Sequence, residues 1–245
     1  MTPDVAICLG TYNRKSLLET CIASIRRSVG QCSHVVLAAD GGSTDGTREW
    51  LTAQPDCELL EGGLDGAVKA LNVAFARAVD LGCPFVVVFN DDIAFVSEYA
   101  EIDAAVALLR IDGNAGAVAF ESDNRGDWRF EEHLGLPYMP QGIVRREAGM
   151  SVARWLGDPE GKRWWGDTHL TYAADTEFGL LLWRLGWTVH TPSGLRVHDP
   201  GYQDAMKDRN RTHYQTMKAF LARFGTPESV AYNHGDAVRC GGVVR

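Results

Sequence analysis

The chain has 245 residues, of which 45% are hydrophobic and 23% are charged. Its 24 Lys and Arg residues stand against 32 Asp and Glu residues, and the net charge of −8 argues against a protein that coats nucleic acid or an anionic membrane, because that task needs clustered basic residues. The length excludes a scaffold with a marginal core. No apolar run approaches the roughly 18 residues of a membrane span, so we expect neither an export signal nor a transmembrane segment.

Six cysteines are scattered along the chain without the C-x-x-C spacing of zinc and redox sites. Several lie inside apolar runs, as Cys8 does between Val5 and Leu9. We therefore expect reduced core thiols in a cytoplasmic protein rather than a disulfide framework. The six are Cys8, Cys21, Cys32, Cys57, Cys83 and Cys240.

Strand and helix patterns alternate along the first 120 residues. Apolar residues at helical spacing predict one helix after each of the first four strands, the first of them with Asn13 placed to cap it and the second opening at Thr44 or Asp45. Such alternation predicts an α/β fold, in which helices cover both faces of a mainly parallel sheet. The predicted strands are 5–11, 35–39, 57–60, 84–89 and 115–120, and the predicted helices are 14–28, 45–51, 68–79 and 102–109.

The pattern changes after residue 120. Residues 121–166 are rich in Gly, Trp, Arg and Glu and show only weak periodicity. Helices are predicted over 173–185 and 206–224, and strands over 188–190 and 195–197. Because no internal repeat or low-complexity linker interrupts the chain, a single domain over 1–245 with a less regular second half is simpler than two independent domains.

Polar residues and glycines follow each of the first four predicted strands. In an open parallel sheet, ligands bind at the carboxyl ends of the strands, so these segments are expected to converge on one pocket. Each of them alone is also explained by a turn or a helix cap. The four segments are Thr11-Tyr-Asn-Arg14, Asp40-Gly-Gly-Ser-Thr-Asp-Gly-Thr47, Gly62-Gly-Leu-Asp-Gly66 and Asn90-Asp-Asp92.

The residues Asn90-Asp-Asp92, which follow the fourth predicted strand, favour a metal site. If strand geometry continues, Asn90 and Asp92 point to one side of the chain and Asp91 points away. Two hard oxygen ligands suit Mg²⁺, which takes one or two carboxylates together with water and phosphate oxygens. The alternative is that the adjacent acids only cap the following helix.

A second group of polar residues lies in the second half. Asp175 and Glu177 open an apolar helix, where the helix dipole also favours acids. Trp164 and Trp165 precede them and could offer a surface to a sugar ring, although burial is the commoner fate of Trp. His198 follows a predicted strand and could bind a metal through its neutral imidazole, although a lone His is more often structural.

In this order the segments resemble the inverting, nucleotide-sugar-dependent glycosyltransferases of family 2, which have the GT-A fold. The resemblance runs from about Val5 to His198. Asn90-Asp-Asp92 occupies the place of the Asp-x-Asp motif, with Asn90 instead of its first Asp. Asp175-Thr-Glu177 resembles the acidic helix start of the family, with Ala174 where the family often has Glu.

The resemblance implies a role for each matching residue. Asp175 would be the catalytic base, with Glu177 as its fallback, and Asp92 and His198 would hold Mn²⁺ or Mg²⁺. Asn90 suits a ribose hydroxyl better than a metal, because it lacks a charge. The residues that would bind the donor are Thr11, Tyr12, Arg14, Asp40, Gly66, Lys69, Asn90 and Asp91.

The implied reaction moves a sugar from a nucleoside diphosphate sugar, with a UDP-sugar as the first expectation, to an acceptor hydroxyl with inversion. Residues 1–120 would bind the donor and residues 121–245 the acceptor. Acceptor choice would lie with 121–166 and the pair Trp164–Trp165. The acceptor itself is not identified, and a saccharide, a lipid-linked glycan and a small molecule all fit.

Three other functions predict different residues at these positions. A nucleotidyltransferase should carry a Gly-rich, basic loop after the first strand, which Thr11-Tyr-Asn-Arg14 is not. A nicotinamide dehydrogenase needs Gly-x-Gly-x-x-Gly, and Leu9-Gly-Thr-Tyr-Asn-Arg14 does not have that spacing. A binding module that has lost catalysis is suggested by Asn90 and Ala174.

Overall fold

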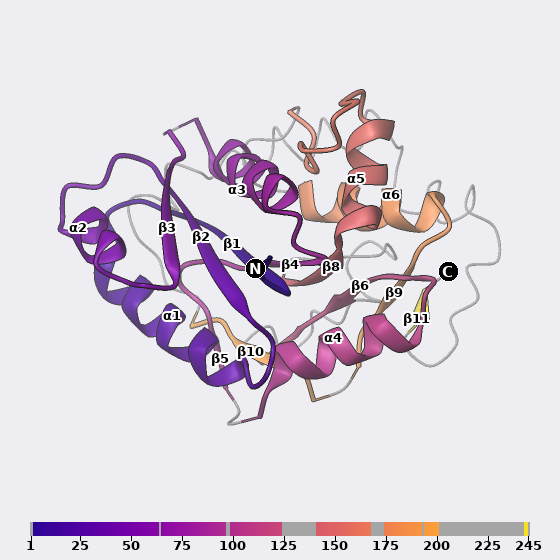
Figure 1. The fold of residues 1–245 in the computed structure, drawn as a ribbon, viewed down its shortest axis with the longest axis horizontal. Coiled ribbons are helices and arrows are strands. Elements are labelled where there is room, and N and C mark those ends of the chain that lie inside the picture. The colour runs from indigo at the N-terminus through magenta and orange to yellow at the C-terminus, as the bar shows by residue number, and fades with distance from the viewer. Residues whose placement is uncertain are drawn as a thin grey trace.

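The computed structural model describes residues 2–63, 65–96, 99–123, 141–167, 174–192, 194–200 and 243–244. Helices cover both faces of a central sheet (Figure 1). The helices are α1 (Lys15–Ser28), α2 (Thr47–Thr52), α3 (Ala67–Leu81), α4 (Glu101–Ile111), α5 (Arg146–Trp155) and α6 (Ala174–Arg184). The strands are β1 (Val5–Thr11), β2 (His34–Asp40), β3 (Cys57–Glu61), β4 (Phe85–Val88), β5 (Ala94–Phe95), β6 (Ala115–Ala119), β7 (Glu121–Ser122), β8 (Gly142–Arg145), β9 (Thr188–His190), β10 (Arg196–His198) and β11 (Val243–Val244).

The main sheet has eight strands in the order β11-β9-β6-β8-β4-β1-β2-β3. Strand β1 pairs in parallel with both β2 and β4, and β6 pairs in parallel with β9. Strand β8 is antiparallel to its neighbours β4 and β6, and β11 is antiparallel to β9. The predicted α/β fold with a mainly parallel sheet is therefore confirmed, with antiparallel strands in addition.

The elements predicted up to residue 120 are present, with ends within a few residues of those expected. Strand β8 and helix α5 were missed, because they lie in the segment of weak periodicity. Strand β8 is short and opens at Gly142, where a Cβ would collide with the carbonyl oxygen of Val118. Helix α5 buries a face of Ala148, Gly149, Val152 and Ala153, three of which are Ala or Gly. The helix predicted over 206–224 lies outside the described residues.

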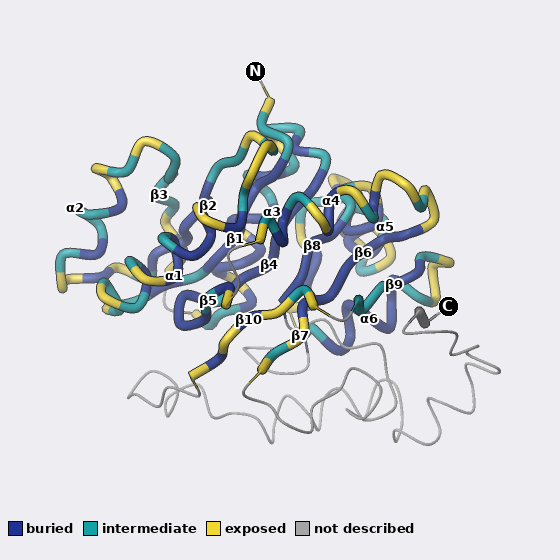
Figure 2. The backbone as a smooth tube through the Cα atoms, turned by 90° about the horizontal axis from the view of Figure 1, so that it is seen from below, coloured by how far each residue is buried: buried dark blue, intermediate teal, exposed yellow. Residues whose placement is uncertain are grey.

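Two apolar layers lie on opposite faces of the main sheet. Side chains alternate along β1, so that Ala6 and Cys8 pack in the layer with α3, α5 and α6. Val5, Ile7 and Leu9 pack in the other layer, with α1 and α4. The helices separate in the same way in Figure 1, and Figure 2 shows the central strands buried along most of their length.

A smaller sheet in the order β5-β10-β7 lies beside the main one. Strand β10 is antiparallel to β5 and parallel to β7, and its register places His198 opposite Ala94. Phe95 anchors this sheet to the core, because its ring stacks on Phe89 at 4.9 Å and its amide donates to Ser24 Oγ at 3.1 Å. The small sheet therefore brings residues 196–198 beside the segment that follows Asp92.

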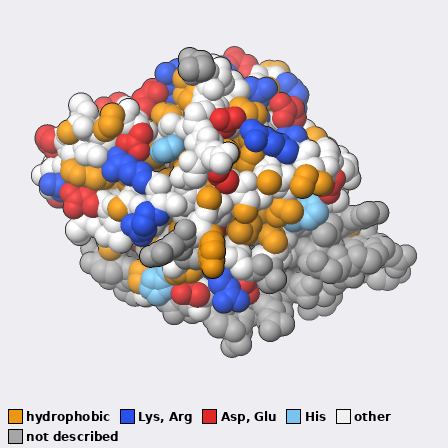
Figure 3. Space-filling view, turned by 60° about the horizontal axis from the view of Figure 1, so that its bottom comes forward, with side chains coloured by type: hydrophobic (Ala, Val, Ile, Leu, Met, Phe, Trp, Pro, Cys, Tyr) orange, Lys and Arg blue, Asp and Glu red, His pale blue; other side chains and the backbone are white. Residues whose placement is uncertain are grey.

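The described surface is mixed in charge. On the described part of the face in Figure 3, Lys and Arg side chains are interspersed with Asp and Glu. Within the parts of the chain that the structure describes, each helix is too short or too polar to cross a lipid bilayer.

Candidate active site

The carboxyl ends of the parallel strands bring the first polar segments together. Gly41 N donates to Thr11 O at 2.9 Å and Gly62 N donates to Asp40 O at 2.8 Å, so each strand end is tied to the loop of its neighbour. Phe89 N donates to Cys8 O at 3.1 Å. This bond holds the start of the acidic turn, which is formed by residues 90–92, against β1. The predicted convergence at one edge of the sheet is therefore present for these segments.

Three hydrogen bonds join the loop after β1 to the loop after β2. Asn13 N donates to Ser43 Oγ and Thr44 N donates to Asn13 Oδ1, both at 2.8 Å. Lys15 N, the first amide of α1, donates to Asp45 Oδ2 at 3.0 Å. The prediction that Asn13 caps this helix is wrong, because Asn13 adopts a φ of 51° and bonds the neighbouring loop, while the first amide is satisfied by a side chain 30 residues away.

Asp40 is fully buried and holds its own loop. Its Oδ2 accepts hydrogen bonds from Gly42 N at 2.8 Å, Ser43 N at 2.9 Å and Arg48 Nη1 at 2.8 Å, and its Oδ1 accepts one from the Ser43 hydroxyl. Burial raises the pKa of Asp40, but the bonds from Ser43, Arg48 and Gly42 outweigh it, and the pKa lies below its ordinary value. In this structure Asp40 shapes the second loop, and its direct contact with the donor stays a prediction.

Arg14 joins the first loop to the acidic turn. Its Nη1 donates to Asp91 Oδ1 at 2.8 Å and lies 3.6 Å from Asp92 Oδ2. The expectation that Asp91 points away from Asp92 is wrong, because β4 ends at Val88 and residues 91–92 form a turn. Both carboxylates are buried and face one guanidinium group. The sequence showed these residue types but not that Arg14 is their partner.

The electrostatic balance at this turn is unusual. Burial raises the pKa of Asp91 to about 6, against the opposing effect of the Arg14 charge and with a smaller contribution from the nearby charge of Asp92. The Thr11 hydroxyl also favours the ionised form of Asp91. Beneath the turn, Cys21 Sγ donates to Asn90 O at 3.4 Å. The turn therefore combines two carboxylates, one amide and one fixed cation in a water-poor setting.

The predicted metal ligands are Asp92, in the turn that leads from β4 to β5, and His198, at the end of β10, which pairs with β5. The imidazole of His198 lies against Asp123, with 3.0 Å between His198 Nδ1 and Asp123 Oδ1. Metal-binding histidines commonly donate from one ring nitrogen to a carboxylate in this way, which leaves the other nitrogen for the ion. Among the residues that the structure describes, no three His, Cys, Asp or Glu side chains already lie close enough to hold an ion. The shared metal site therefore stays a prediction.

Helix α3 begins at the same edge of the sheet. Gly66 precedes it with a φ of 108°, a conformation that favours glycine. Lys69, in its first turn, lies 3.1 Å from Asp65 Oδ2, and both side chains are largely exposed. Tyr12 is half-buried in the first loop. Gly66 and Lys69 thus lie at the start of α3, and their predicted contact with the donor stays a prediction.

Helix α6 carries the two acids of the second half. The sheet makes β9 parallel to β1, and α6 reaches β9 through a short turn in which Trp187 N donates to Leu182 O at 3.0 Å. The N-terminus of α6 therefore faces the carboxyl edge that holds the nucleotide loops. Asp175 is half-buried there, and its Oδ1 accepts from Thr176 N at 2.8 Å, whereas Glu177 is buried.

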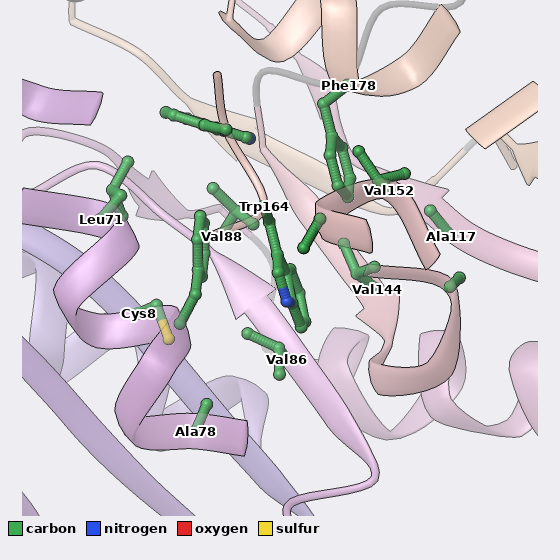
Figure 4. Packing of buried hydrophobic residues seen from close by; sticks show 14 of the residues in the cluster. Cys8, Leu71, Ala78, Val86, Val88, Ala117, Val144, Val152, Trp164 and Phe178 are labelled. Carbon is green, nitrogen blue, oxygen red and sulfur yellow. The ribbon is translucent and has the colours of Figure 1, made fainter. Parts of the chain in front are cut away.

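Trp164 and Trp165 do not form the acceptor surface that the sequence suggested. Both are buried, and Trp164 is wholly enclosed between α3 and α6 (Figure 4). Its ring stacks on Phe75 at 4.9 Å and on Phe178 at 6.2 Å, and its Nε1 donates to Gly161 O at 3.0 Å. This part of the acceptor prediction is wrong because two helices meet at this tryptophan and bury it.

The chain is similar to known proteins both in sequence and in fold. The sequence profile of glycosyl transferase family 2 matches residues 6–155, more than half of the chain. The chain belongs to glycosyl transferase family 2. The predicted glycosyltransferase activity class is thereby confirmed. The match covers the loops with Arg14, Asp40 and Asp92, whereas Asp175 and His198 lie beyond its end.

Solved structures show the same fold for this glycosyltransferase. It is similar to the mannosyltransferase PcManGT from Pyrobaculum calidifontis, with a TM-score of 0.67 and 20% identity over 96% of this chain and 70% of that one. It is also similar to glucosyl-3-phosphoglycerate synthase from Mycobacterium tuberculosis, with a TM-score of 0.63 and 19% identity over 92% and 80%. For TarS of S. aureus the TM-score is 0.65 and the identity 15%, over 90% of this chain and 66% of that one. At such identities the likeness shows the fold alone, and it confirms the GT-A prediction. A search of curated proteins found no match.

Proposed function

We propose that this family 2 glycosyltransferase moves a sugar from a nucleoside diphosphate sugar, with a UDP-sugar as the first candidate, to an acceptor hydroxyl with inversion. The observation that carries the proposal is the buried cluster of Arg14, Asp91 and Asp92 where the loops after β1 and β4 meet. The donor class is supported by similar structures that hold GDP-Man with Mn²⁺, UDP with Mn²⁺, and UDP-GlcNAc.

The donor would lie along the carboxyl edge of the sheet. Arg14 is held by its carboxylate partners, so its guanidinium has a fixed direction toward the turn. Among the described residues Lys69 pairs with the exposed Asp65, and such exposed pairs are weak, so its ammonium group can exchange the carboxylate for a phosphate. The full donor-binding set is Thr11, Tyr12, Arg14, Asp40, Gly66, Lys69, Asn90 and Asp91.

A divalent ion, Mn²⁺ or Mg²⁺, fits the donor atoms of Asp92 and His198. Asp92 offers a buried carboxylate in the acidic turn. His198 has Asp123 at Nδ1, which fixes the ring and presents Nε2 as the ligand atom. When bound, the ion supplies positive charge that stabilises the diphosphate as it leaves. Two of the similar structures were solved with Mn²⁺, which supports the use of a divalent ion.

The proposed transfer is a single in-line displacement. The acceptor oxygen forms a bond to the anomeric carbon while the bond from that carbon to the diphosphate oxygen breaks, and the bonding electrons leave with the diphosphate. Asp175 takes the proton of the acceptor hydroxyl. Its place in the first turn of α6 favours the ionised carboxylate that a base requires, because the helix dipole stabilises negative charge there.

We further propose that residues 1–245 form one catalytic domain, with donor binding in 1–120 and acceptor binding in 121–245. Strands β8 and β9 of the second half belong to the same sheet as β1, which supports a single unit. The acceptor would be a saccharide, a lipid-linked glycan or a small molecule. The five cysteines in the described residues are free, which supports work in the reducing cytoplasm.

The test is binding and turnover with a panel of nucleotide sugars. Thermal shift and calorimetry with UDP- and GDP-sugars, with and without Mn²⁺ or Mg²⁺, should show metal-dependent binding of one donor. Mn²⁺ with that donor should also release free sugar slowly by hydrolysis. The variant Asp92→Ala should lose the metal-dependent part of donor binding, whereas Asp167→Ala, which removes an exposed carboxylate paired with Arg163, should not.

Two outcomes would contradict the proposal. Undiminished metal-dependent binding in Asp92→Ala would remove Asp92 from the metal site. Donor binding without any transfer or hydrolysis would instead support a module that has lost catalysis.

A further inference from the structure

Asn72 is a polar side chain on the buried face of α3. Its neighbours on that face include Val68, Leu71 and Phe75, which belong to the apolar layer under α3, α5 and α6. Asn72 itself is 7% exposed. An amide in such a layer is unfavourable unless its hydrogen bonds are made, so its presence calls for specific partners.

Both polar ends of Asn72 bond the main chain of Trp165. Asn72 Nδ2 donates to Trp165 O at 2.9 Å, and Trp165 N donates to Asn72 Oδ1 at 3.1 Å. The amide therefore pairs with one residue as a neighbouring strand would. The two residues are 93 positions apart, and the bonds join α3 to the segment that precedes α6.

The segment 164–165, which Asn72 binds, also lies between α3 and α6, the helices that carry the proposed site residues Lys69 and Asp175. Trp164 stacks on Phe75 of α3 and on Phe178 of α6. Asn72 follows Lys69 by three residues, and Phe178 follows Asp175 by three residues, so each anchor lies about one helical turn from a proposed site residue. The segment 164–165 thus connects the middle of α3 to the first half of α6.

Stacking alone would not fix this connection. Aromatic rings slide over one another at little cost, whereas paired hydrogen bonds are directional and set the position of a backbone to within tenths of an ångström. Asn72 supplies that directionality, because it bonds both the N–H and the C=O of one peptide residue.

We propose that Asn72 is a positioning residue for sugar transfer, which acts through Trp164 and Trp165 to set the place of Asp175 relative to the donor. The inference rests on the proposed function. Removing the clamp should disturb the alignment of base, acceptor and donor without removing any group that binds the donor. A displacement of about 1 Å can lower turnover by about 10²-fold.

The test compares Asn72→Leu and Asn72→Asp with wild type. Asn72→Leu removes both hydrogen bonds at similar volume and should lower kcat by about tenfold or more, while KM for the donor changes by less than about twofold. The matched control is Ser151→Ala, which removes two hydrogen bonds, one accepted from Trp187 Nε1 and one donated to Ala148 O, in the same layer of helices without touching 164–165. Its kcat should stay close to that of wild type.

Asn72→Asp adds a readout that a merely structural role would not give. A protonated Asp has the shape of Asn and can donate to Trp165 O, whereas an ionised one faces that oxygen with a second acceptor. Burial raises the pKa of such a carboxyl group, so the ratio of the variant's kcat to that of wild type should rise as the pH falls from about 8 to about 6. The ratio for Asn72→Leu should stay flat.

The outcomes separate this inference from the function on which it rests. If wild type never transfers sugar, the proposed function is overturned. If wild type transfers and Asn72→Leu keeps its kcat, or loses no more than Ser151→Ala, only the role of Asn72 is overturned. If Asn72→Leu does not fold, a pH-independent ratio for Asn72→Asp would overturn it by itself.

Discussion

Arg14 and Asp91 form a buried ion pair across 77 residues, with 2.8 Å between Arg14 Nη1 and Asp91 Oδ1. The pair fastens the first loop to the acidic turn, and Asp92 lies within 3.6 Å of the same guanidinium nitrogen. Burial raises the pKa of Asp91 to about 6, and the charge of Arg14 is the largest effect that favours its ionised form. The charge state of the acidic turn therefore depends on a residue of another loop.

The first prediction concerns the stability of this pair. Arg14→Met should destabilise the fold by about 3 to 5 kcal/mol, because it leaves a buried carboxylate without its cation. Adding Asp91→Asn to Arg14→Met should recover part of that loss, since one of the two carboxylates that face Arg14 is then neutral. Urea denaturation of both single variants and the double variant measures the coupling. Strictly additive losses would contradict a direct interaction.

A second prediction concerns the base. Asp175→Asn should keep donor affinity and lower kcat by about 10² to 10⁴, because the acceptor hydroxyl loses its proton acceptor. Glu177→Gln is the comparison, since Glu177 lies in the same helical turn but is buried. Steady-state transfer assays with donor calorimetry separate binding from turnover. A large loss in Glu177→Gln with Asp175→Asn unaffected would move the role to Glu177.

Gly149 lies against Trp164, and the contact reverses the usual effect of alanine in a helix. A Cβ at Gly149 would lie 2.5 Å from Trp164 Cδ2, so Gly149→Ala should destabilise the protein by about 1 to 3 kcal/mol despite better helix propensity. Gly113→Ala is the control, because a Cβ there meets nothing within 4 Å. Thermal unfolding of both variants tests this. A higher Tm for Gly149→Ala would refute the contact.

The two adjacent tryptophans differ in their indole N–H groups. Trp164 Nε1 donates to Gly161 O, whereas Trp165 Nε1 is buried without a hydrogen-bond partner among the described residues. Both substitutions to Phe remove similar ring volume, but only Trp164→Phe breaks a bond. Trp164→Phe should therefore lower the free energy of unfolding by about 1 kcal/mol more than Trp165→Phe does, as measured by chemical denaturation. Equal losses would contradict this difference.

The carboxylate of Asp56 should make part of the stability of the fold sensitive to acid. Hydrogen bonds from Arg26 lower the pKa of Asp56 to about 2, below the value of about 3.9 for an unfolded chain. With the folded pKa below the unfolded one, this carboxylate stabilises the fold above about pH 4, and the contribution is lost as the pH falls from about 4 to about 2.

The variant Arg26→Gln isolates that contribution. Its Tm should lie below that of wild type at neutral pH, and the two should converge as the pH falls toward about 2. Arg110→Gln, which breaks the more exposed pair with Asp4, should show a smaller difference. A Tm difference for Arg26→Gln that does not change with pH would show that packing, not the ion pair, is responsible.

The sequence by itself determined the alternating strands and helices, the polar segments after the strands and the family. These features are local, because hydrophobic period and turn residues are properties of neighbouring positions. Local patterns did not predict β8 and α5. Each contains a glycine that a tertiary contact requires, because Gly142 lies close to Val118 and Gly149 lies close to Trp164.

Only the tertiary structure decided which side chains meet. Asp45 bonds the first amide of α1 instead of Asn13, Arg14 pairs with Asp91, and Asn72 clamps Trp165. The partners lie 30 to 93 positions apart, and their meeting follows from the order of strands in the sheet and the packing of helices upon it. The same packing buried Trp164, because α3 and α6 close on it from both sides.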